Sequence, residues 1–246
     1  MPRFFVLPTD IDKNSKTAAL YGDDARHIAR SLRMAEGDTI TVCDGEGTEY
    51  TARLTRIRDE ECLLSLEKES LSEAEPLAEI TLFMAYPKGD KLETVVQKAV
   101  ELGCTRIVPF ISERCIKRPS DERQDKQTAR LLRIAHEAAK QCGRGRLPAV
   151  ENVISFDELL KRIPDYTLTL FCYEGEGTES LKRVLSRGDT YKTIAVIVGS
   201  EGGFSENEAE KICSNGGTAV GLGKRILRCE TAPTVCLSMI CYALEL

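Results

Sequence analysis

The first part of the chain alternates apolar and polar residues at the two-residue period of β-strands. Strands are predicted at Arg3–Leu7, Thr39–Cys43, Glu49–Ile57 and Cys62–Leu66, with a short helix at Asp24–Met34. Between the second and third strands, Asp44-Gly45-Glu46-Gly47 is typical of a hairpin turn. We therefore expect residues 1–72 to form a small β-barrel, with the linker to the rest of the chain in the acidic, Pro76-containing stretch Glu69–Glu79.

From Ile80 onward the pattern changes to short apolar runs that alternate with helical periods. Strands are predicted at Ile80–Tyr86, Arg106–Ile111, Thr167–Tyr173, Thr193–Val198 and Thr218–Leu222. Helices are predicted at Lys91–Leu102, Asp125–Cys142, Ser155–Ile163, Glu179–Leu185, Glu206–Ser214 and Ala232–Leu244. Two of these helices start with the serine–glutamate spacing of a capping box. Such alternation is typical of a parallel sheet covered by helices on both faces, which we expect for residues 73–246.

The composition fits a soluble globular protein. The 246 residues are 42% hydrophobic, which allows a packed core. No apolar run approaches the roughly 20 residues that span a bilayer, and the N-terminus lacks the apolar region of a signal peptide, so we expect a cytoplasmic protein with no membrane partner. The ten cysteines form no C-x-x-C pair, and with two histidines the chain predicts reduced structural thiols and no metal site.

The charge is unevenly distributed. The formal net charge is −5, from 34 basic and 39 acidic residues. Between Ile111 and Pro148, however, the sequence has ten basic residues (Arg123 among them) and five acidic ones, a local net charge of +5. This segment is either a solvated helix face or a surface that neutralises the phosphates of a nucleic acid, and the overall acidity does not exclude RNA.

Two glycine-containing loops follow predicted strands, where open α/β sheets bind ligands. The first, Gly199–Gly203, combines glycines that let the backbone approach a ligand with the exposed N–H groups of a helix start. It matches neither a P-loop nor a dinucleotide fingerprint. The alternative is a tight strand-to-helix turn without a ligand.

The second loop, Gly221–Ala232, mixes apolar and charged residues between two buried elements. Its apolar residues could flank a flat ring, while Arg228 and Glu230 lie just before a helix. The alternative is a helix-capping turn with an exposed Arg228–Glu230 ion pair. The mixed composition of this loop favours a functional role over a purely structural one.

In order and spacing, the two loops resemble those of the knotted (SPOUT) methyltransferases, and more closely the RsmE family of 16S rRNA uridine-N3 methyltransferases. The matching segments are Pro2–Val6, His27–Asp38, Lys88–Gly103, Ile111–Cys115, Glu137–Pro148, Gly199–Phe204 and Leu222–Ala232. Ser200 departs from the family, which usually has proline there, and Cys229 stands where threonine is frequent.

The resemblance implies a fold and partners that the spacing alone does not show. Residues 73–246 should form a trefoil-knotted α/β domain with a mainly parallel sheet, and residues 1–72 a PUA-like RNA-binding β-barrel. S-adenosylmethionine should bind in a bent form between the two loops and the strand end near Phe171–Glu174. The protein should be a homodimer with its site at the dimer interface. The substrate should be one uridine, at position 1498 of 16S rRNA in the small ribosomal subunit.

Roles for individual residues follow from the same resemblance. The expected cofactor contacts are Gly199, Ser200, Glu201, Gly202, Leu222, Gly223, Ile226 and Leu227. Arg228 is the candidate cation for the charge that develops on the uracil ring, and Glu201 and Glu230 are candidate proton acceptors or ribose contacts, with no ranking between them. The expected RNA contacts are Arg3, Arg26, Arg30, Arg33, Lys88, Lys91, Arg114, Arg144 and Arg146.

Three alternatives remain open on the sequence. The same enzyme class could act on a tRNA or on large-subunit rRNA. A catalytically silent RNA-binding or assembly factor could retain the fold, although the intact Arg228–Thr231 segment argues against it. A nucleotide-phosphate hydrolase is disfavoured by the missing P-loop lysine and acidic metal pair.

Overall fold

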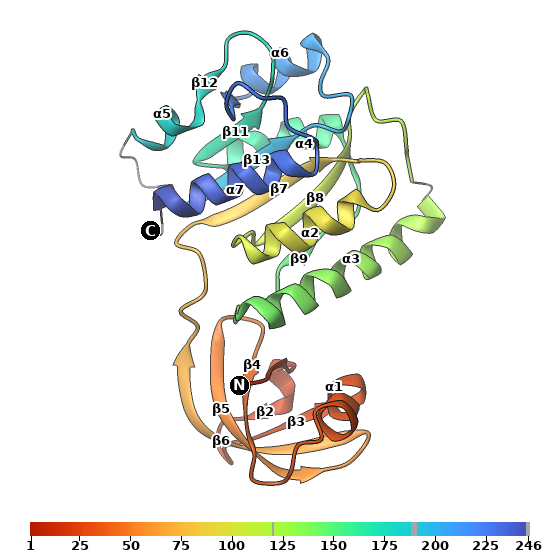
Figure 1. The fold of residues 1–246 in the computed structure, drawn as a ribbon, viewed down its shortest axis with the longest axis vertical. Helices are drawn as coiled ribbons and strands as arrows, with labels where there is room; N and C mark the ends of the chain where they lie inside the picture. Colours follow the sequence, from red (N-terminus) through yellow and green to blue (C-terminus); the bar gives the residue numbers. More distant parts are fainter. Residues whose placement is uncertain (120, 188–190, 245–246) are drawn as a thin grey trace. The chain divides into compact units, whose positions relative to one another are not determined.

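The computed structural model describes residues 1–119, 121–187 and 191–244, without the side chains of residues 121–123. The side chain of Arg123, in the basic segment, therefore lies outside what the structure describes. The chain forms two compact units (Figure 1). The first consists of Met1–Glu75 and Ala139–Leu147, and the second of Pro76–Ala138 and Pro148–Leu246.

The first unit is built on a curled six-stranded sheet with the order β1-β4-β5-β6-β3-β2. The strands are β1 (Arg3–Phe5), β2 (Ile11–Asp12), β3 (Thr17–Tyr21), β4 (Thr39–Cys43), β5 (Thr48–Ile57) and β6 (Glu61–Leu71). β1 pairs with β4 in parallel, and the other ladders are antiparallel. Two register shifts between β5 and β6 increase the local twist and favour curling of the sheet.

The inward-facing side chains of these strands form the core of the first unit. Ile40, Val42, Ala52 and Leu64 are buried, as is Ile28 from the short helix. That helix is α1 (Gly22–Arg26), continued by a π-helical turn at His27–Ser31.

Two strands of this unit were not predicted. β2 and β3 form a hairpin, and β3 pairs with β6 so that Ala18 and Leu20 enter the core while their neighbours stay partly or fully exposed. This is strand alternation, but with small or polar residues at most positions the pattern is weak. β6 also continues to Leu71, which shortens the predicted linker.

A buried ion pair connects Glu75 to the returning segment of the first unit. The Arg144 guanidinium, with a side chain only 2% exposed, donates to the Glu75 carboxylate at 2.8 Å. The backbone N–H groups of Gly145 and Arg146 donate to the same carboxylate at 2.9 and 3.0 Å. Burial alone would raise the pKa of Glu75, but these donors outweigh it and hold the pKa below its ordinary value.

The second unit contains a parallel sheet with the order β10-β8-β7-β13-β11-β14-β12, and β9 pairs with β8. Its strands are β7 (Glu79–Ala85), β8 (Arg106–Ile111), β9 (Ala149–Val150), β10 (Ile154–Ser155), β11 (Leu168–Cys172), β12 (Glu179–Ser180), β13 (Thr193–Val198) and β14 (Thr218–Gly221). Every ladder between them is parallel, so the prediction of a parallel sheet is confirmed.

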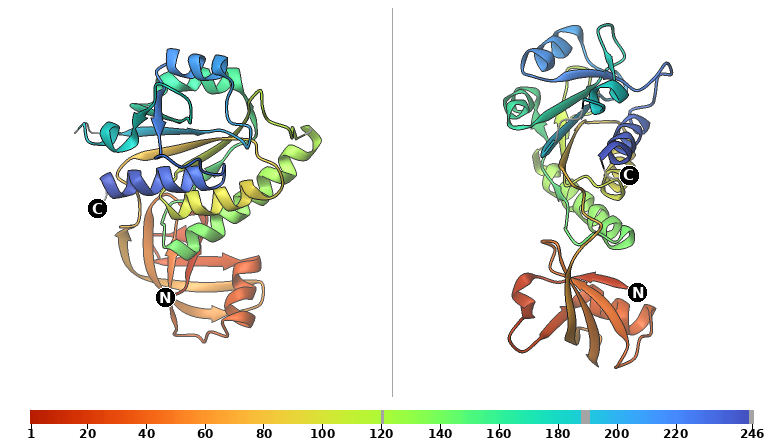
Figure 2. Two further views of the ribbon diagram at one scale, coloured as in Figure 1. Left: turned by 45° about the horizontal axis from the view of Figure 1, so that its top comes forward. Right: turned by 90° about the vertical axis from the view of Figure 1, so that its left-hand side faces the viewer.

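Helices cover both faces of this sheet, as predicted. They are α2 (Lys91–Glu101), α3 (Asp121–Cys142), α4 (Phe156–Arg162), α5 (Leu181–Leu185), α6 (Glu206–Ser214) and α7 (Thr231–Leu244). Figure 2 shows α2 and α7 side by side on one face and α4 and α6 on the other. The capping boxes at Ser155 and Ser205 are both present.

One helix of the second unit begins later than predicted. The helix expected over residues 179–185 begins only at Leu181, because Glu179 and Ser180 pair with β14 as an edge strand. The sequence of a two-residue strand carries no period that could reveal it.

Within the described parts of the chain, no helix is both long and apolar enough to cross a membrane. All ten cysteines are free thiols, and six of them are buried. No group of three or more histidine, cysteine or acidic side chains arranged for a metal ion occurs among the described residues.

Candidate functional site

A cleft of about 520 Å³ opens at the carboxyl edge of the second unit's sheet. Its walls are the segments that follow three neighbouring strands: residues 172–178 after β11, residues 198–204 after β13 and residues 220–229 after β14. Because all three strands are parallel, their carboxyl ends meet at one edge, where α/β sheets bind ligands. The volume lies in the range of about 300–1,000 Å³ that is typical of small-molecule sites.

Both predicted loops form walls of this cleft. Seven of the eight expected cofactor contacts line it: Gly199, Ser200, Glu201, Leu222, Gly223, Ile226 and Leu227. Ile226 lies at the rim with its side chain 85% exposed. Gly202 faces away, because a Cβ there would stand 2.9 Å from the Cβ of Arg114. A larger residue at Gly202 would therefore displace Arg114 instead of filling the cleft.

The first loop is a tight turn in which two glycines are required. At Gly199 a Cβ would stand 2.9 Å from the ring of Phe204. Gly203 has φ +63°, and a Cβ there would stand 2.9 Å from the Glu174 carboxylate. The ring of Phe204 packs against those of Phe171 and Phe110, with centroids 4.8 and 6.2 Å away, which anchors the end of the turn. The backbone of the loop is thereby held at the cleft.

Ser200, the departure from the family pattern, is buried with 6% of its surface exposed. Its hydroxyl group has no hydrogen-bond partner among the described residues. A buried hydroxyl without a partner costs stability. The backbone carbonyl of Ser200 accepts a hydrogen bond from Gly203 N–H at 3.0 Å, so the turn itself is closed.

Lys91, at the start of α2, joins two carboxylates of the site. Its ammonium group lies 2.8 Å from the Glu201 carboxylate and 3.5 Å from that of Glu230. The backbone N–H of Lys88 also donates to Glu201, at 3.1 Å. The sequence placed Lys91 among the RNA contacts, whereas the structure places it in the cleft wall.

The pKa values of the two carboxylates are lowered. For Glu201, partial burial would raise the pKa, but the hydrogen bonds from Lys91 and from backbone N–H groups outweigh it. For Glu230, a hydrogen bond from its own backbone N–H is the main cause of the lower pKa, supported by Cys229 and Lys91. Both side chains are therefore ionised at neutral pH.

The Cys229 thiol stays protonated beside these carboxylates. Burial is the main cause, followed by its hydrogen bond to Glu230 at 3.2 Å, and together they raise the pKa of Cys229 to about 12. A thiol in this state is a poor nucleophile, so Cys229 acts here as a hydrogen-bond donor.

Arg228 lines the cleft with an exposed side chain. Within the described part of the chain, its guanidinium forms no ion pair, because Glu230 pairs with Lys91 instead. The alternative of an Arg228–Glu230 ion pair is therefore wrong, and the charge of Arg228 is available to a ligand.

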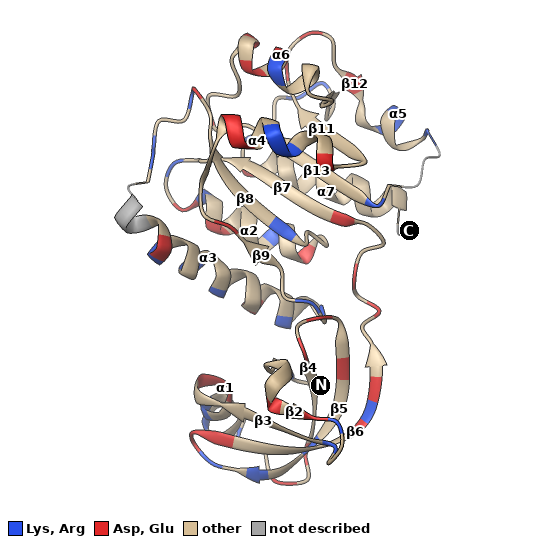
Figure 3. Cartoon of the chain, turned by 180° about the vertical axis from the view of Figure 1, so that it is seen from behind, with Lys and Arg blue, Asp and Glu red and all other residues tan. Residues whose placement is uncertain are grey.

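Several arginines expected to contact RNA are engaged by acidic neighbours in the first unit. Arg3 pairs with Glu49 at 2.7 Å. Arg26 pairs with Glu60 at 2.6 Å, and Arg30 pairs with Asp59. Acidic and basic positions lie close together on the strands of this unit, as Figure 3 shows. Charge pairing of this kind reduces the attraction for phosphate.

The other expected RNA contacts differ in exposure. Arg144 is buried against Glu75, and the Arg146 guanidinium donates to the backbone carbonyl of Glu46 at 3.1 Å. Arg33 and Lys88 are exposed, and so is Arg114, which donates to the backbone carbonyl of Gly202 at 3.0 Å.

Comparisons with known proteins show which family the chain belongs to. Residues 73–241 match the model of an RNA methyltransferase domain, and residues 20–67 match that of an RNA methyltransferase PUA domain. The chain belongs to this RNA methyltransferase family. Within it, the chain is 33% identical to ribosomal RNA small subunit methyltransferase E of Bacillus subtilis (strain 168), over 100% of this chain and 98% of the relative. The membership in the RsmE family predicted from the sequence is confirmed.

Two further members of the RNA methyltransferase family support this placement. The small subunit methyltransferase E of Synechocystis sp. (strain ATCC 27184 / PCC 6803 / Kazusa) is 34% identical, over 99% of this chain and 78% of the relative. The crystal structure of that enzyme from Neisseria gonorrhoeae, bound to S-adenosyl methionine, has a TM-score of 0.86 and 33% identity, over 98% of this chain and 97% of that one.

Proposed function

We propose that this methyltransferase transfers the methyl group of S-adenosylmethionine to N3 of one uridine, at position 1498 of 16S rRNA in the small ribosomal subunit. One observation carries the proposal. Arg228, which forms no ion pair with any residue that the structure describes, lies in the wall of the same cleft as the Lys91–Glu201–Glu230 cluster. Family membership adds the reaction class, and the names of the relatives add small-subunit rRNA.

The residues of the cleft fit the proposed cofactor. Residues 199–201 and 221–223 line the cleft with backbone that an adenine edge can approach, and Leu222 and Leu227 offer apolar surface to its ring. When bound, S-adenosylmethionine supplies a methyl group on a sulfonium centre, so the electrophile comes from the cofactor. The residues of the protein align N3 of the uridine with this methyl group and control the loss of the proton from N3.

The two carboxylates of the cluster differ in how closely the Lys91 ammonium group contacts them. Glu201 accepts hydrogen bonds from Lys91 and from the backbone of Lys88, so its role is to hold Lys91 in place. Glu230 also accepts from the Cys229 thiol and from its own backbone N–H, but Lys91 contacts it only at the longer distance of 3.5 Å. Glu230 is therefore the proposed acceptor of the N3 proton. Arg228 stabilises the negative charge that then develops on N3 and the uracil carbonyl oxygens.

The two domains are proposed to have separate roles. Residues 1–72 form the RNA-binding module, supported by the match to a PUA domain, and residues 73–246 form the methyltransferase domain. Arg33, Lys88 and Arg114 remain proposed RNA contacts because their side chains are exposed and, among the described residues, form no ion pair. Arg3, Arg26 and Arg30 would first have to release their carboxylates.

A homodimer is also part of the proposal, with the site at its interface. Residues on the outer faces of α5 and α7 line an apolar groove of about 770 Å³, which includes Val235, Met239 and Tyr242. Tyr242 is 75% exposed, and a second copy docked in this groove would cover it. Light scattering should give the mass of two chains, and a Met239→Asp variant should give the mass of one.

A trefoil knot in residues 73–246 and a cytoplasmic location are also proposed. For the knot, the support is the path of the chain after β14, which leaves the sheet beside β11 and returns as α7 to pack on β13 and α2. The location follows from the proposed ribosomal substrate.

Transfer of labelled methyl groups to different RNAs tests the proposed substrate. Purified small subunits, naked 16S rRNA, large subunits and tRNA are incubated separately with the labelled cofactor. Label on the small subunit or on 16S rRNA alone is expected. Label on large subunits or tRNA would indicate the same chemistry on another RNA, and an absence of both label and cofactor binding would indicate a silent RNA-binding factor.

A further inference from the structure

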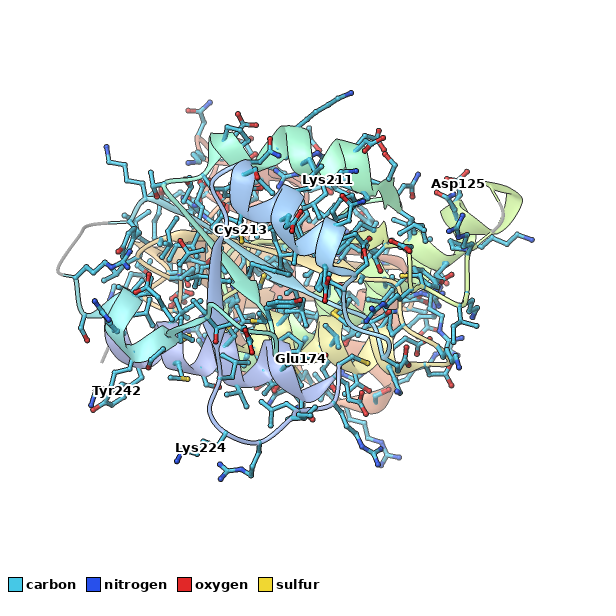
Figure 4. All side chains as sticks on the ribbon, turned by 90° about the horizontal axis from the view of Figure 1, so that it is seen from above. Asp125, Glu174, Lys211, Cys213, Lys224 and Tyr242 are labelled. Atoms are coloured by element: carbon cyan, nitrogen blue, oxygen red, sulfur yellow. The ribbon has the colours of Figure 1, made fainter. Side chains whose placement is uncertain are left out.

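Two exposed basic loops lie at the carboxyl edge of the second unit's sheet. Residues 112–119, here called the β8 loop, follow β8 and contain Arg114, Lys117 and Arg118. Residues 222–228, here called the β14 loop, follow β14 and contain Lys224, Arg225 and Arg228. All six cationic side chains are exposed. Figure 4 shows Lys224 projecting outward from the β14 loop.

The cations of these loops differ from those of the first unit in their partners. Lys117, Arg118, Lys224, Arg225 and Arg228 form no ion pair with any described residue. The Arg114 guanidinium donates to a backbone carbonyl, which leaves its charge uncompensated. The two loops therefore carry net positive charge in a protein whose overall charge is −5.

Each loop also exposes one isoleucine. Ile116 in the β8 loop is 75% exposed, and Ile226 in the β14 loop is 85% exposed. A phosphate-binding surface alone does not need an exposed aliphatic side chain, whereas unpaired bases present apolar faces that such side chains can contact.

The cleft lies between the loops along the sheet edge. In the strand order, β7, β13 and β11 separate β8 from β14, and four strand spacings amount to about 19 Å. The β8 loop contacts the glycine turn beside the cleft through the hydrogen bond between Arg114 and Gly202, while the β14 loop is itself a cleft wall. Lys88 follows β7 at the same edge and is exposed as well.

We propose that the two loops bind one continuous single strand of RNA that crosses the carboxyl edge of the sheet. Their cations contact its phosphates, and Ile116 and Ile226 contact bases on either side of the target nucleotide. This inference rests on the proposed function. N3 of uridine lies on the edge used for base pairing, so the target base must be unpaired to reach the cleft. A single strand satisfies this requirement, and a duplex does not.

Binding of labelled RNA to full-length variants tests the proposal. Fluorescence anisotropy follows the titration of a fluorescein-labelled single-stranded oligouridine, and of a duplex RNA of the same length, over a series of salt concentrations. One variant carries Lys117→Ala with Arg118→Ala, and another carries Lys224→Ala with Arg225→Ala. The control carries Lys161→Ala with Lys211→Ala, which removes the same charge from exposed positions on α4 and α6.

Each loop variant should bind the single strand about tenfold more weakly, whereas the control should bind like the wild type. The plot of log affinity against log salt should become flatter by about 1.4, at about 0.7 for each lost phosphate contact. A loop variant that matches the control, or a duplex that binds as tightly as the single strand, would overturn the proposal. Calorimetric titration with S-adenosylmethionine runs in parallel, and failure of the wild type to bind it would count against the proposed function without affecting the RNA result.

Discussion

The ammonium group of Lys91 lies 2.8 Å from the carboxylate of Glu201, although 110 positions separate the two residues in the sequence. The pairing of strands in the sheet explains why the two residues lie so close together. Lys91 follows β7 and Glu201 follows β13, and these two strands pair in parallel over the whole length of β13. Their carboxyl ends therefore bring the start of α2 against the glycine turn.

Removal of the Lys91 charge should impair methyl transfer. In Lys91→Met, Glu201 and Glu230 lose the cation that favours their ionised forms, so their pKa values should rise. The carboxylates also lose the contact that positions them in the cleft, so the rate at neutral pH should fall about 100-fold. The acidic limb of the pH–rate profile should move to higher pH. Lys98→Met, on the same helix but paired with Glu101, is the control and should keep the wild-type rate. An unchanged acidic limb in Lys91→Met would contradict the role of the cluster.

Arg228→Ala should lower turnover without weakening cofactor binding. The variant loses the cation that stabilises the developing uracil charge, and kcat should fall by about 100- to 1,000-fold. Calorimetry should show little change in affinity for S-adenosylmethionine. Arg183→Ala, which removes an exposed arginine from α5, serves as the control. Normal turnover of Arg228→Ala would rule out its proposed role.

Ser200→Ala should stabilise the protein. The substitution removes a buried hydroxyl that has no hydrogen-bond partner among the described residues, and the gain should be about 1 kcal/mol in the free energy of unfolding. Urea denaturation of the cofactor-free protein measures it. Ser214→Ala removes a hydroxyl that donates to the backbone carbonyl of Glu210 at 2.7 Å, so this control should show no gain. A loss of stability in Ser200→Ala would mean that the hydroxyl is satisfied in solution.

The Glu75–Arg144 pair should dominate the acid sensitivity of the first unit. Because the folded-state pKa of Glu75 lies below its ordinary value of 4.5, the pair contributes its full stability above that pH. The contribution is lost as the pH falls through the lower folded-state value. Glu75→Gln leaves a buried arginine uncompensated and should cost about 3 kcal/mol at neutral pH. Glu73→Gln, at an exposed neighbouring position, should leave the denaturation curve unchanged.

Much of the second unit could be predicted from the sequence because its elements have strong local patterns. The bounds of β8, β13 and α6 agree with the prediction, since the strands are continuous apolar runs and the helix starts with a capping box. The edge strand β12 could not be predicted, because it exists only through its pairing with β14.

The candidate site was predicted in part for the same reason. Both glycine loops could be identified because glycine and charge patterns are local. The role of Lys91 could not, since it depends on the order of strands in the sheet. Likewise, Arg26 and Arg30 looked available for RNA because their partners, Glu60 and Asp59, lie about thirty positions away.

Mapping of the modified nucleoside tests the central proposal most directly. Small subunits that lack the modification are incubated with the enzyme and labelled S-adenosylmethionine, and the rRNA is digested and analysed by mass spectrometry. We predict a single 3-methyluridine at position 1498, formed by the wild type and strongly reduced with Arg228→Ala. Methylation at a ring carbon or a ribose oxygen, or at a different nucleotide, would contradict the proposed function.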